Sequence, residues 1–329
     1  EMAQGGIDPV VMEVSSVGLH QRRVKAVKFD TAIFTNLTRD HLDYHESMEA
    51  YGNNKKKLFT SEGLSQAIVN LDDPYALSII NAIAPSVDIY TYSLKNSAAT
   101  VYAESLSLTR QGFEARLVTP IGAVTVKGKL FGYFNVSNLL AVITTLINYL
   151  PKKKVLDIAQ LCELVSGLSS VDGRMEIIGD FEEITAVVDY AHTPDGLRSA
   201  LKGLRDHFSG NIWCVFGGGG NRDKGKRPIM GEVAETFADR LIITDDNPRN
   251  EKGDDIVQHI LSGMNKPEEA VIERDREKAI AYAIANAESG DVVVVAGKGH
   301  ETYQDVGGSR LIFSDASQVR LALQAREKK

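Results

Sequence analysis

Two histidines, two aspartates and an asparagine fall within one short stretch of this chain, FTNLTRDHLDYH at residues 34–45. The stretch follows a short apolar segment and Glu13 follows another, so we expect Glu13, His41 and Asp43 to share a cleft at the ends of two strands. Carboxylate oxygens and an imidazole suit a divalent cation such as Mg²⁺, which also binds water and substrate phosphate. The alternative is that His41 and His45 cap the turn and the following helix. The stretch alone does not decide between the two.

The helical stretch that follows, SMEAYGNNKKKLF, places one lysine on its apolar face. Tyr51 and Leu58 mark that face, and the helical spacing puts Lys55 between them, whereas the next two lysines do not share the face. A lysine that points inward is costly as an ammonium ion, and an uncharged amine can add carbon dioxide to become an anionic carbamate that binds metal. The commoner alternative is a lysine whose stem packs while its head reaches water.

Four further polar segments each follow a buried-type strand in the second half of the chain: DYAHTPDG, GGGGNRDKGKRP, DDNPRNE and GKGHE. Their charged and imidazole side chains include Asp189, His192, Arg222, Lys224, Lys226, Arg227, Asp246, Arg249, Lys298, His300 and Glu301. In open α/β sheets, ligands bind where the carboxyl ends of parallel strands meet. Solvated loops would explain any one of these segments, but the four together predict a ligand site.

The glycine run at residues 217–220 does not match a nucleotide-binding fingerprint. Counted from either of its first two glycines, G-x-G-x-x-G ends on Arg222 or Asp223, and G-x-x-x-x-G-K-[ST] occurs nowhere in the chain. We therefore expect the run to let the backbone approach a ligand closely, with Pro228 at the first position of the next helix.

The elements that carry these segments predict an α/β fold in two parts. In the first part, strands are expected near 10–14, 30–35, 67–71 and 88–92, with helices near 46–59 and 74–83. Residues 100–128 alternate between apolar and polar with turns at TRQG and TPIG, which is typical of a β-hairpin or meander. Helices near 135–149 and 156–166 follow.

From residue 184 onward, buried-type strands and amphipathic stretches alternate regularly, which predicts a doubly wound domain. We place the boundary near Ser169 to Met175, which gives one domain at 1–170 and another at 171–329. The chain opens directly in a strand-like run, VVMEVSS, so we expect the first domain to be partial.

The composition argues against several classes of protein. The 329 residues are 43% hydrophobic and 25% charged, which is globular composition with apolar material for about two domains. A net charge of −7 argues against a nucleic-acid partner. Cys162 and Cys214 look like small buried hydrophobes, as expected in a reducing cytoplasm. The longest apolar run, at 139–150, is too short to cross a bilayer, so no membrane association is expected.

Eight motifs in this order resemble the Mur ligases of peptidoglycan synthesis: EVSS, TNLTRDHLDYH, FNVSN, GRME, DYAHTPDG, GGGGNRDKGKRP, DDNPRNE and AGKGHE. That family has a UDP-binding N-terminal domain, a central ATPase domain with a P-loop and a Rossmann-like C-terminal domain. The resemblance implies that this chain holds a remnant of the central ATPase domain followed by the doubly wound, Rossmann-like C-terminal domain. By the same resemblance, the N-terminal UDP-binding domain and the P-loop segment lie outside it, so residues 1–329 alone should bind ATP weakly and show no ligase activity.

The resemblance also implies a role for each matching position. Magnesium would be held by Glu13, His41 and Lys55, the last as a carbamate. UDP-MurNAc-L-Ala-D-Glu would be held by Ser15, Gln21 and Arg23. The adenine, phosphates and ribose of ATP would lie near Asn138, Arg174 and Asp189. The pocket for meso-2,6-diaminopimelate would be formed by Arg222, Asp246, Asn247, Pro248, Arg249, Gly297 and Glu301.

The reaction implied by the resemblance is an ADP-forming ligation that adds meso-diaminopimelate to UDP-MurNAc-L-Ala-D-Glu. ATP would phosphorylate the side-chain carboxylate of D-Glu, and the amine of diaminopimelate would displace phosphate from the acyl phosphate. Magnesium, Arg174 and lysines would offset the charge on the transferred phosphoryl group. Such an enzyme would be a cytoplasmic monomer that uses Mg²⁺ and ATP and has no nucleic-acid or membrane partner.

The chain departs from the family pattern where Val17 replaces a histidine and His20 stands at a position that is often apolar. By the resemblance, both positions lie where contacts to the sugar or the metal are expected. Two other hypotheses stay open: a non-catalytic fragment that holds an amino acid in its C-terminal loops, and a metal-dependent hydrolase built on Glu13, His41, Asp43 and His45. Among family relatives, DDNPRNE argues against the folylpolyglutamate-forming enzymes.

Overall fold

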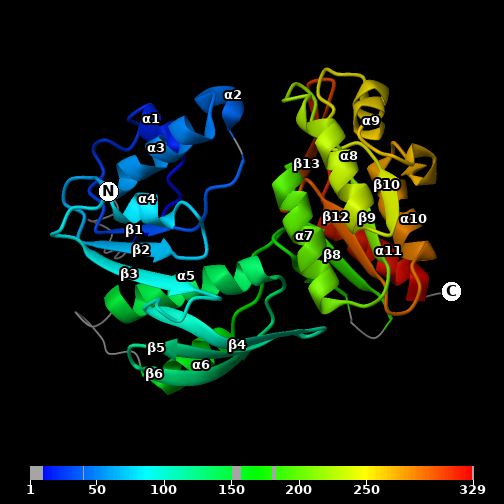
Figure 1. The fold of residues 1–329 in the computed structure, drawn as a ribbon. Coiled ribbons are helices and arrows are strands. Elements are labelled where there is room, and N and C mark those ends of the chain that lie inside the picture. The colour runs from blue at the N-terminus through cyan, green and yellow to red at the C-terminus, as the bar shows by residue number, and fades with distance from the viewer. Residues whose placement is uncertain (1–9, 40, 150–156, 180–182, 328–329) are drawn as a thin grey trace. The chain divides into compact units, whose positions relative to one another are not determined.

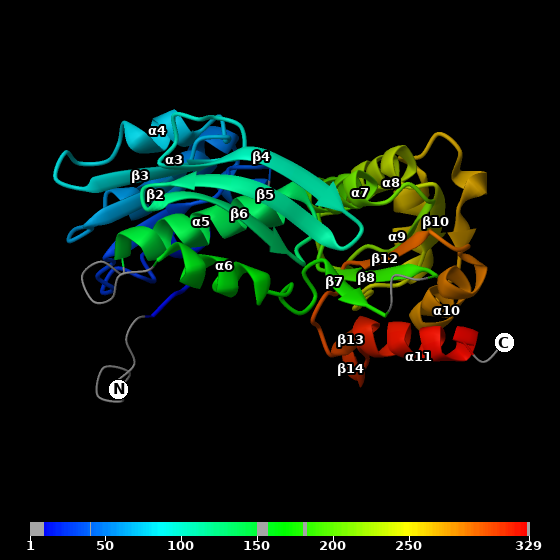
Figure 2. The ribbon, with the colours of Figure 1, turned by 90° about the horizontal axis from the view of Figure 1, so that it is seen from below.

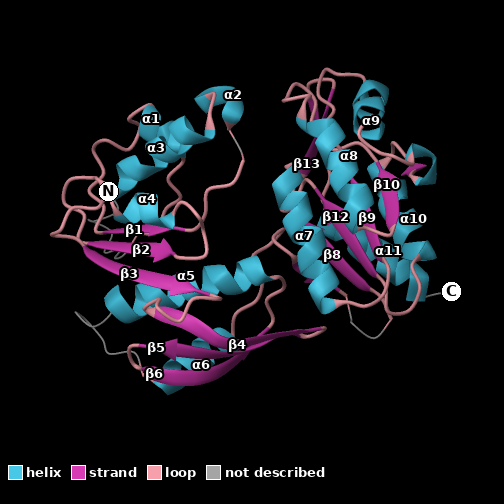
Figure 3. Ribbon diagram, in the orientation of Figure 1, coloured by secondary structure: helices cyan, strands magenta, loops and turns pink. Residues whose placement is uncertain are grey.

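The chain divides into two compact units, Glu1–Thr100 and Val101–Lys329. The computed structural model describes residues 10–39, 41–149, 157–179 and 183–327. Figure 1 follows the elements in chain order, and Figure 3 shows helices and strands in both units. The α/β prediction is therefore confirmed, while the domain boundary that we place between residues 170 and 171 stays a prediction.

The first unit contains a ladder of three parallel strands and a group of helices. The strands are β1 (Thr31–Phe34), β2 (Gln66–Asn70) and β3 (Asp88–Ser93), which pair in that order. The helices are α1 (Ser16–His20), α2 (Leu42–His45), α3 (Met48–Phe59) and α4 (Ala76–Ile80). All five residues of β2 are buried, as in the middle strand of a covered sheet. Phe34, Phe59 and Ile79 join β1, α3 and α4 in one core.

One predicted strand is wrong. Residues 10–15 form no strand, and the chain enters α1 at Ser16. An apolar run becomes a strand only where a neighbouring strand takes its backbone hydrogen bonds, and no described strand pairs with this segment. Ser15 instead caps the helix, because its hydroxyl accepts a hydrogen bond from the Gly18 N–H at 3.0 Å. The strands expected near 30–35, 67–71 and 88–92 are confirmed.

The second unit begins with the expected antiparallel meander. Its strands are β4 (Val101–Thr109), β5 (Gly112–Thr119) and β6 (Gly122–Gly128), followed by α5 (Tyr133–Tyr149) and α6 (Ile158–Ser166). Gly112 has φ of +130°, and a Cβ there would lie 2.0 Å from the Gly128 carbonyl oxygen, so only glycine fits. Asp157 and Gln160 form a capping box that begins α6. The helices expected near 135–149 and 156–166 are thus confirmed.

The rest of the second unit is a doubly wound sheet whose strands run in the order β11-β10-β9-β12-β8-β7. Their bounds are β7 (Glu176–Ile178), β8 (Thr185–Asp189), β9 (Ile212–Phe216), β10 (Arg240–Ile243), β11 (Val271–Ile272) and β12 (Val292–Ala296). All neighbours are parallel except β7 and β8. A 3₁₀ helix (Pro267–Glu269) precedes β11, and a hairpin of β13 (Tyr303–Val306) and β14 (Ser309–Ile312) follows β12.

Helices cover both faces of this sheet. One face packs on α7 (Pro194–His207), α8 (Lys226–Phe237) and α9 (Gly253–Leu261), and the other on α10 (Arg276–Asn286) and α11 (Asp315–Glu327), as Figure 2 shows. Alternate residues of each strand enter the two cores: Cys214 and Val294 face one, and Val215 and Val295 face the other. No helix in the described parts of the chain combines the length and apolar character that a bilayer crossing requires.

Candidate functional site

The doubly wound sheet brings the four polar segments to one edge. Strands β8, β9, β10 and β12 are mutually parallel, so their carboxyl ends, and the loops that follow them, lie on the same side. The shared edge that we predicted is therefore confirmed. It is the edge where sheets of this kind bind ligands.

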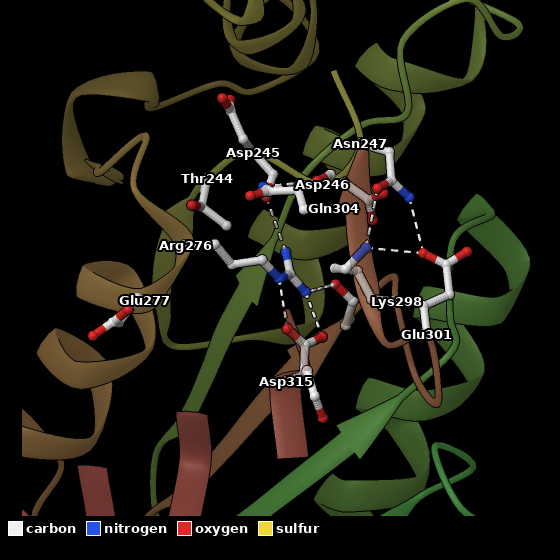
Figure 4. Close-up of polar contacts among 12 residues, drawn as sticks. Thr244, Asp245, Asp246, Asn247, Arg276, Glu277, Lys298, Glu301, Gln304 and Asp315 are labelled. Carbon is white, nitrogen blue, oxygen red and sulfur yellow. Dashed lines mark hydrogen bonds and ion pairs between the residues drawn. The ribbon is translucent and has the colours of Figure 1, made fainter. Parts of the chain in front are cut away.

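Lys298 is the centre of a buried polar cluster at this edge (Figure 4). Its side chain is 0% exposed, and its ammonium donates hydrogen bonds to Asn247 Oδ1 at 3.1 Å and Glu301 Oε2 at 2.9 Å. The ammonium also lies 5.6 Å from the centre of the Tyr303 ring. A buried ammonium needs such partners because its desolvation is otherwise too costly. The cluster is thus organised around one fixed positive charge.

The neighbours of Lys298 are held in fixed orientations. The Asn247 amide donates to Glu301 Oε2 at 2.9 Å, and its oxygen accepts from the Asp305 N–H at 2.8 Å. Burial alone would raise the pKa of Glu301, but the hydrogen bonds from Lys298 and Asn247 outweigh it and lower the pKa. Glu301 is therefore a carboxylate at neutral pH, able to receive an ammonium group of a ligand.

Asp246 is the second acidic side chain of the cluster. It is 7% exposed, and burial raises the pKa of its carboxyl group, although Arg276 and Lys298 act in the opposite direction. A Cβ at position 297 would lie 2.4 Å from Asp246 Oδ2, so the carboxylate packs directly on the backbone of Gly297. The glycine is required there both for this approach and for its φ of +120°.

The sequence analysis did not predict the ion pair between Arg276 and Asp315, which lies next to this cluster (Figure 4). Arg276 and Asp315 are both 0% exposed, and their side chains meet through Nε and Oδ1 at 2.7 Å and Nη2 and Oδ2 at 2.8 Å. Arg276 Nη2 also donates to the Ala296 carbonyl at 3.0 Å, at the end of β12. Gln304, equally unforeseen, donates to the Asp246 carbonyl at 2.9 Å. No spacing in the sequence connects these positions.

The glycine run packs against the backbone of the loop after β10, which we did not expect. A Cβ at Gly217 would lie 2.1 Å from the Thr244 carbonyl oxygen, and one at Gly220 would lie 1.8 Å from that of Pro248. The Gly220 N–H donates to the Asn247 carbonyl at 2.9 Å. At these two glycines the close approach is to the neighbouring loop, and the expected approach to a ligand stays a prediction.

The position predicted for Pro228 is also wrong. Helix α8 begins at Lys226, so Pro228 is its third residue and Arg227 its second. Proline is tolerated there because the N–H groups of the first turn have no acceptor within the helix.

Arg249 lies at the junction of two loops. Its φ of +51° is left-handed, and its N–H donates to the Asp305 carbonyl at 2.9 Å. One guanidinium nitrogen, Nη1, donates to the Gly220 carbonyl at 2.7 Å, and the side chain is half-buried. Arg222 is exposed on the glycine-rich loop. Both guanidinium groups thus belong to the two loops that meet at the edge.

The residues expected near ATP have different surroundings. Asp189 is buried, and its carboxylate accepts hydrogen bonds from the Met175 and Ala191 N–H groups, both at 2.8 Å. Burial raises the pKa of Asp189 despite these bonds and nearby Arg174. Arg174 is exposed, with its guanidinium 4.5 Å from the centre of the Tyr190 ring. Asn138 is exposed on α5.

In the first unit, His45 is buried and contacts other side chains of the protein. It is 5% exposed, its Nε2 lies 2.9 Å from Ser16 Oγ, and its Nδ1 lies 3.4 Å from Asn54 Nδ2. Its ring stacks on Tyr51 with centres 5.3 Å apart. Both ring nitrogens are therefore used within the protein, which argues against the hydrolase hypothesis.

His41 and Lys55 lie around the same aromatic ring. The His41 and Tyr51 ring centres are 6.0 Å apart, and Lys55 Nζ lies 5.1 Å from the Tyr51 centre. The other two lysines differ: Lys56 Nζ lies over another ring, and Lys57 Nζ donates to an asparagine oxygen at 2.6 Å. His41 is exposed and left-handed, with φ of +54°. Of the three lysines, Lys55 is the one that shares an aromatic neighbour with His41.

The other expected residues of the first unit are at the surface. Glu13, Gln21 and Arg23 are exposed, and the side chain of Asp43 lies outside the described residues. His20 Nδ1 lies 2.8 Å from the Tyr44 hydroxyl. Within the described ranges, no group of three or more His, Cys, Asp and Glu side chains forms a metal site.

The chain matches two family domains. The Mur ligase middle domain matches residues 1–146, and the Mur ligase glutamate ligase domain matches residues 173–299. UDP-N-acetylmuramoyl-L-alanyl-D-glutamate–2,6-diaminopimelate ligase of Xanthomonas campestris pv. campestris (strain 8004) is 47% identical over 99% of this chain and 65% of its own length. The ligase of the same name from Pseudomonas putida is 44% identical over 99% of this chain and 66% of its own length. The chain thus spans about two thirds of the length of these relatives.

Solved structures of Mur ligases are also similar to this chain. A structure of a UDP-N-acetylmuramoyl-L-alanyl-D-glutamate–2,6-diaminopimelate ligase is 40% identical, with a TM-score of 0.64 over 96% of this chain and 64% of that one. MurF from Acinetobacter baumannii shares the fold at 17% identity, with a TM-score of 0.67 over 93% of this chain and 61% of that one. The chain therefore belongs to the Mur ligase family and carries that family's middle domain and its C-terminal ligase domain.

Proposed function

We propose that this chain provides the metal-binding and amino-acid-binding parts of an ATP-dependent, ADP-forming amide ligase. The enzyme would add meso-diaminopimelate to UDP-MurNAc-L-Ala-D-Glu in peptidoglycan precursor synthesis, as the names of the relatives indicate for those proteins. The observation that carries the proposal is the polar cluster at the sheet edge. Glu301 offers a carboxylate there, and the loops that meet at this edge carry Arg222 and Arg249.

The side chains at this edge suit diaminopimelate better than lysine. Diaminopimelate has a carboxylate at its far end that lysine lacks, and a planar guanidinium can bind that group through two parallel hydrogen bonds. Arg249 uses Nη1 for the Gly220 carbonyl, which fixes the guanidinium and leaves donors for a ligand. We propose that Arg249 binds the far carboxylate, Arg222 the other carboxylate and Glu301 an ammonium. Asp246, Asn247, Pro248 and Gly297 would shape the same pocket.

The reaction would proceed in two steps. The γ-phosphoryl group of ATP passes to the side-chain carboxylate of D-Glu, which gives ADP and an acyl phosphate. The uncharged amine of diaminopimelate then attacks the carbonyl carbon, the new C–N bond forms, and phosphate leaves as the amine loses a proton. In this proposal Arg174 offsets phosphoryl charge, Asn138 and Asp189 lie beside the nucleoside of ATP, and the muramyl substrate contacts Ser15, Gln21 and Arg23.

The donor set of the first unit fits magnesium. A carboxylate from Glu13, an imidazole from His41 and a carbamate on Lys55 would supply the oxygen-rich ligand set that Mg²⁺ prefers. The arrangement of His41 and Lys55 around Tyr51 supports this assignment. Bound magnesium would offset negative charge on the phosphoryl oxygens.

We further propose a cytoplasmic monomer with domains at residues 1–170 and 171–329. Cys162 and Cys214 are both free thiols, as is usual for proteins of a reducing compartment.

Titration calorimetry of the chain with meso-diaminopimelate and with L-lysine tests the amino-acid site. A charge-assisted contact from Arg249 is worth about 1.5–3 kcal/mol, or roughly 10- to 150-fold in selectivity. We expect Arg249→Ala to remove that preference. Arg240→Ala is the matched control, because Arg240 is exposed at the opposite end of β10. Equal affinity of the unaltered chain for the two amino acids would contradict the proposed substrate.

Ligation itself is tested with a longer polypeptide that contains a P-loop. The assay measures ADP release that depends on both meso-diaminopimelate and UDP-MurNAc-L-Ala-D-Glu. ADP release without the amino acid would indicate a different acceptor.

A further inference from the structure

Another ion pair, formed by the buried Arg227 and the partly exposed Glu251, lies at the two loops that meet at the sheet edge. Arg227 has a side chain that is 1% exposed, and Glu251 is 17% exposed. Their contact is bidentate, with Nη1 to Oε2 and Nη2 to Oε1 both at 3.0 Å. Two parallel hydrogen bonds between a guanidinium and a carboxylate give a fixed mutual geometry as well as attraction.

Each member of the pair also contacts the glycine-rich loop. Arg227 Nη2 donates to the Gly219 carbonyl at 3.0 Å, and Glu251 Oε1 accepts from the Asn221 N–H at 2.5 Å. Asn221 has a left-handed φ of +53°, and its side-chain oxygen accepts from the Asn250 N–H at 3.2 Å. The ion pair therefore joins residues 217–221 to the loop after β10.

Glu251 keeps its negative charge over a wide pH range. Hydrogen bonds from Arg227 are the main reason that the pKa of Glu251 is lowered to about 2. The guanidinium has a third side-chain contact, because His259 Nδ1 lies 3.0 Å from Arg227 Nη1. Glu251 is thus a carboxylate at neutral pH, and the hydrogen bonds of both side chains are made within the protein.

The glycine-rich loop needs this restraint. A run of four glycines loses more backbone entropy on ordering than any other sequence of that length. The loop is nevertheless held where Arg249 Nη1 can reach the Gly220 carbonyl. Arg222 follows the run directly, so its position depends on where the run is held.

We propose that Arg227 and Glu251 are positioning residues for amino-acid selectivity. Their ion pair sets the separation of the loops that carry Arg222 and Arg249, and therefore the spacing of the two carboxylates that the pocket accepts. This inference rests on the proposed amino-acid site. Neither member of the pair touches the ligand.

Three variants of the full chain separate positioning from simple stability. Glu251→Gln keeps the shape and removes the charge, and Arg227→Lys keeps the charge and removes the bidentate geometry. The double variant Arg227→Met/Glu251→Leu removes both charges and fills the space with apolar groups. It should therefore be more stable than a variant that leaves one charge without its partner. Thermal unfolding reports stability, and titration calorimetry gives Kd for meso-diaminopimelate and for L-lysine.

The preference for meso-diaminopimelate over L-lysine is expected to fall about tenfold in all three variants, a loss of about 1.4 kcal/mol. The double variant is the decisive case, because its Tm recovers while its selectivity stays low. Selectivity that recovers together with Tm would overturn the proposal, since the pair would then act through stability alone. Unchanged selectivity in Glu251→Gln would overturn it as well.

Amide hydrogen exchange of the ligand-free chain separates this inference from the proposed function. The N–H groups of Gly220 and Asn221 are hydrogen-bonded to the neighbouring loop, so they should exchange slowly in the unaltered chain and at least tenfold faster in Glu251→Gln. If Glu251→Gln exchanges faster but the unaltered chain does not bind meso-diaminopimelate, the ion pair does restrain the loops and the proposed amino acid is wrong. Unchanged exchange would refute the restraint itself.

Discussion

Removing Asp315 should destabilise the C-terminal domain strongly, because its carboxylate is the partner of a completely buried guanidinium. The Asp315 and Arg276 side chains are both 0% exposed and share hydrogen bonds of 2.7 and 2.8 Å. Breaking a buried pair by removing one partner costs about 3–5 kcal/mol. We therefore expect Asp315→Leu to lower the free energy of unfolding by about that amount.

The double variant Arg276→Met/Asp315→Leu should recover most of this loss. Apolar side chains of similar volume often replace a buried ion pair at little net cost. The Ala296 carbonyl loses the donor that Arg276 Nη2 provides at 3.0 Å, and this contact is not recovered. The Asp245 carbonyl, 3.4 Å from Arg276 Nη1, keeps a donor from Gln304. A lost partner of that kind costs about 1–3 kcal/mol. The double variant should therefore lie within roughly 3 kcal/mol of the unaltered chain.

Urea unfolding followed by tryptophan fluorescence measures these differences. Trp213 is the chain's one tryptophan and is 9% exposed within β9 of the same sheet. Arg205→Met is the control, because Arg205 pairs with Asp239 at 42% and 40% exposure, where an ion pair contributes about 0–1 kcal/mol. A loss below about 1 kcal/mol in Asp315→Leu would refute the reasoning. A double variant whose loss equals the summed losses of Asp315→Leu and Arg276→Met would refute it as well.

Three further predictions concern other parts of the chain. With magnesium, nucleotide and ¹³C-labelled bicarbonate, a carbamate signal should appear in NMR spectra, vanish in Lys55→Ala and persist in Lys56→Ala. The pKa of Glu251 is lowered from 4.5 to about 2, so its contribution to stability is complete above pH 4.5 and lost as the pH falls towards 2. The difference in unfolding free energy between the unaltered chain and Glu251→Gln should shrink over that range, and a constant difference would argue against it. Burial raises the pKa of Cys214 to about 12, so a thiol reagent should label Cys162 in the native chain and Cys214 only after unfolding.

The sequence predicted the strands and the edge that they share because hydrophobic patterning is a local signal. The buried runs that became β8, β9, β10 and β12 are continuous apolar segments, and parallel strands necessarily place their carboxyl ends together. The run at 10–14 was misassigned because pattern alone does not supply a pairing strand. The position of Pro228 was misassigned because proline is tolerated throughout the first turn of a helix.

The contacts within the candidate site were decided by tertiary structure alone. Residue types in the four loops suggested a ligand site, yet nothing in the sequence indicated that Lys298 would be completely buried between Asn247 and Glu301. Arg276 and Asp315 are far apart in the chain and belong to the first turns of different helices, so no spacing rule could pair them. Residue type and local periodicity determine which elements form and which edge is polar. Which charges become partners depends on the packing of helices across the sheet, because only that packing removes water from both groups at once.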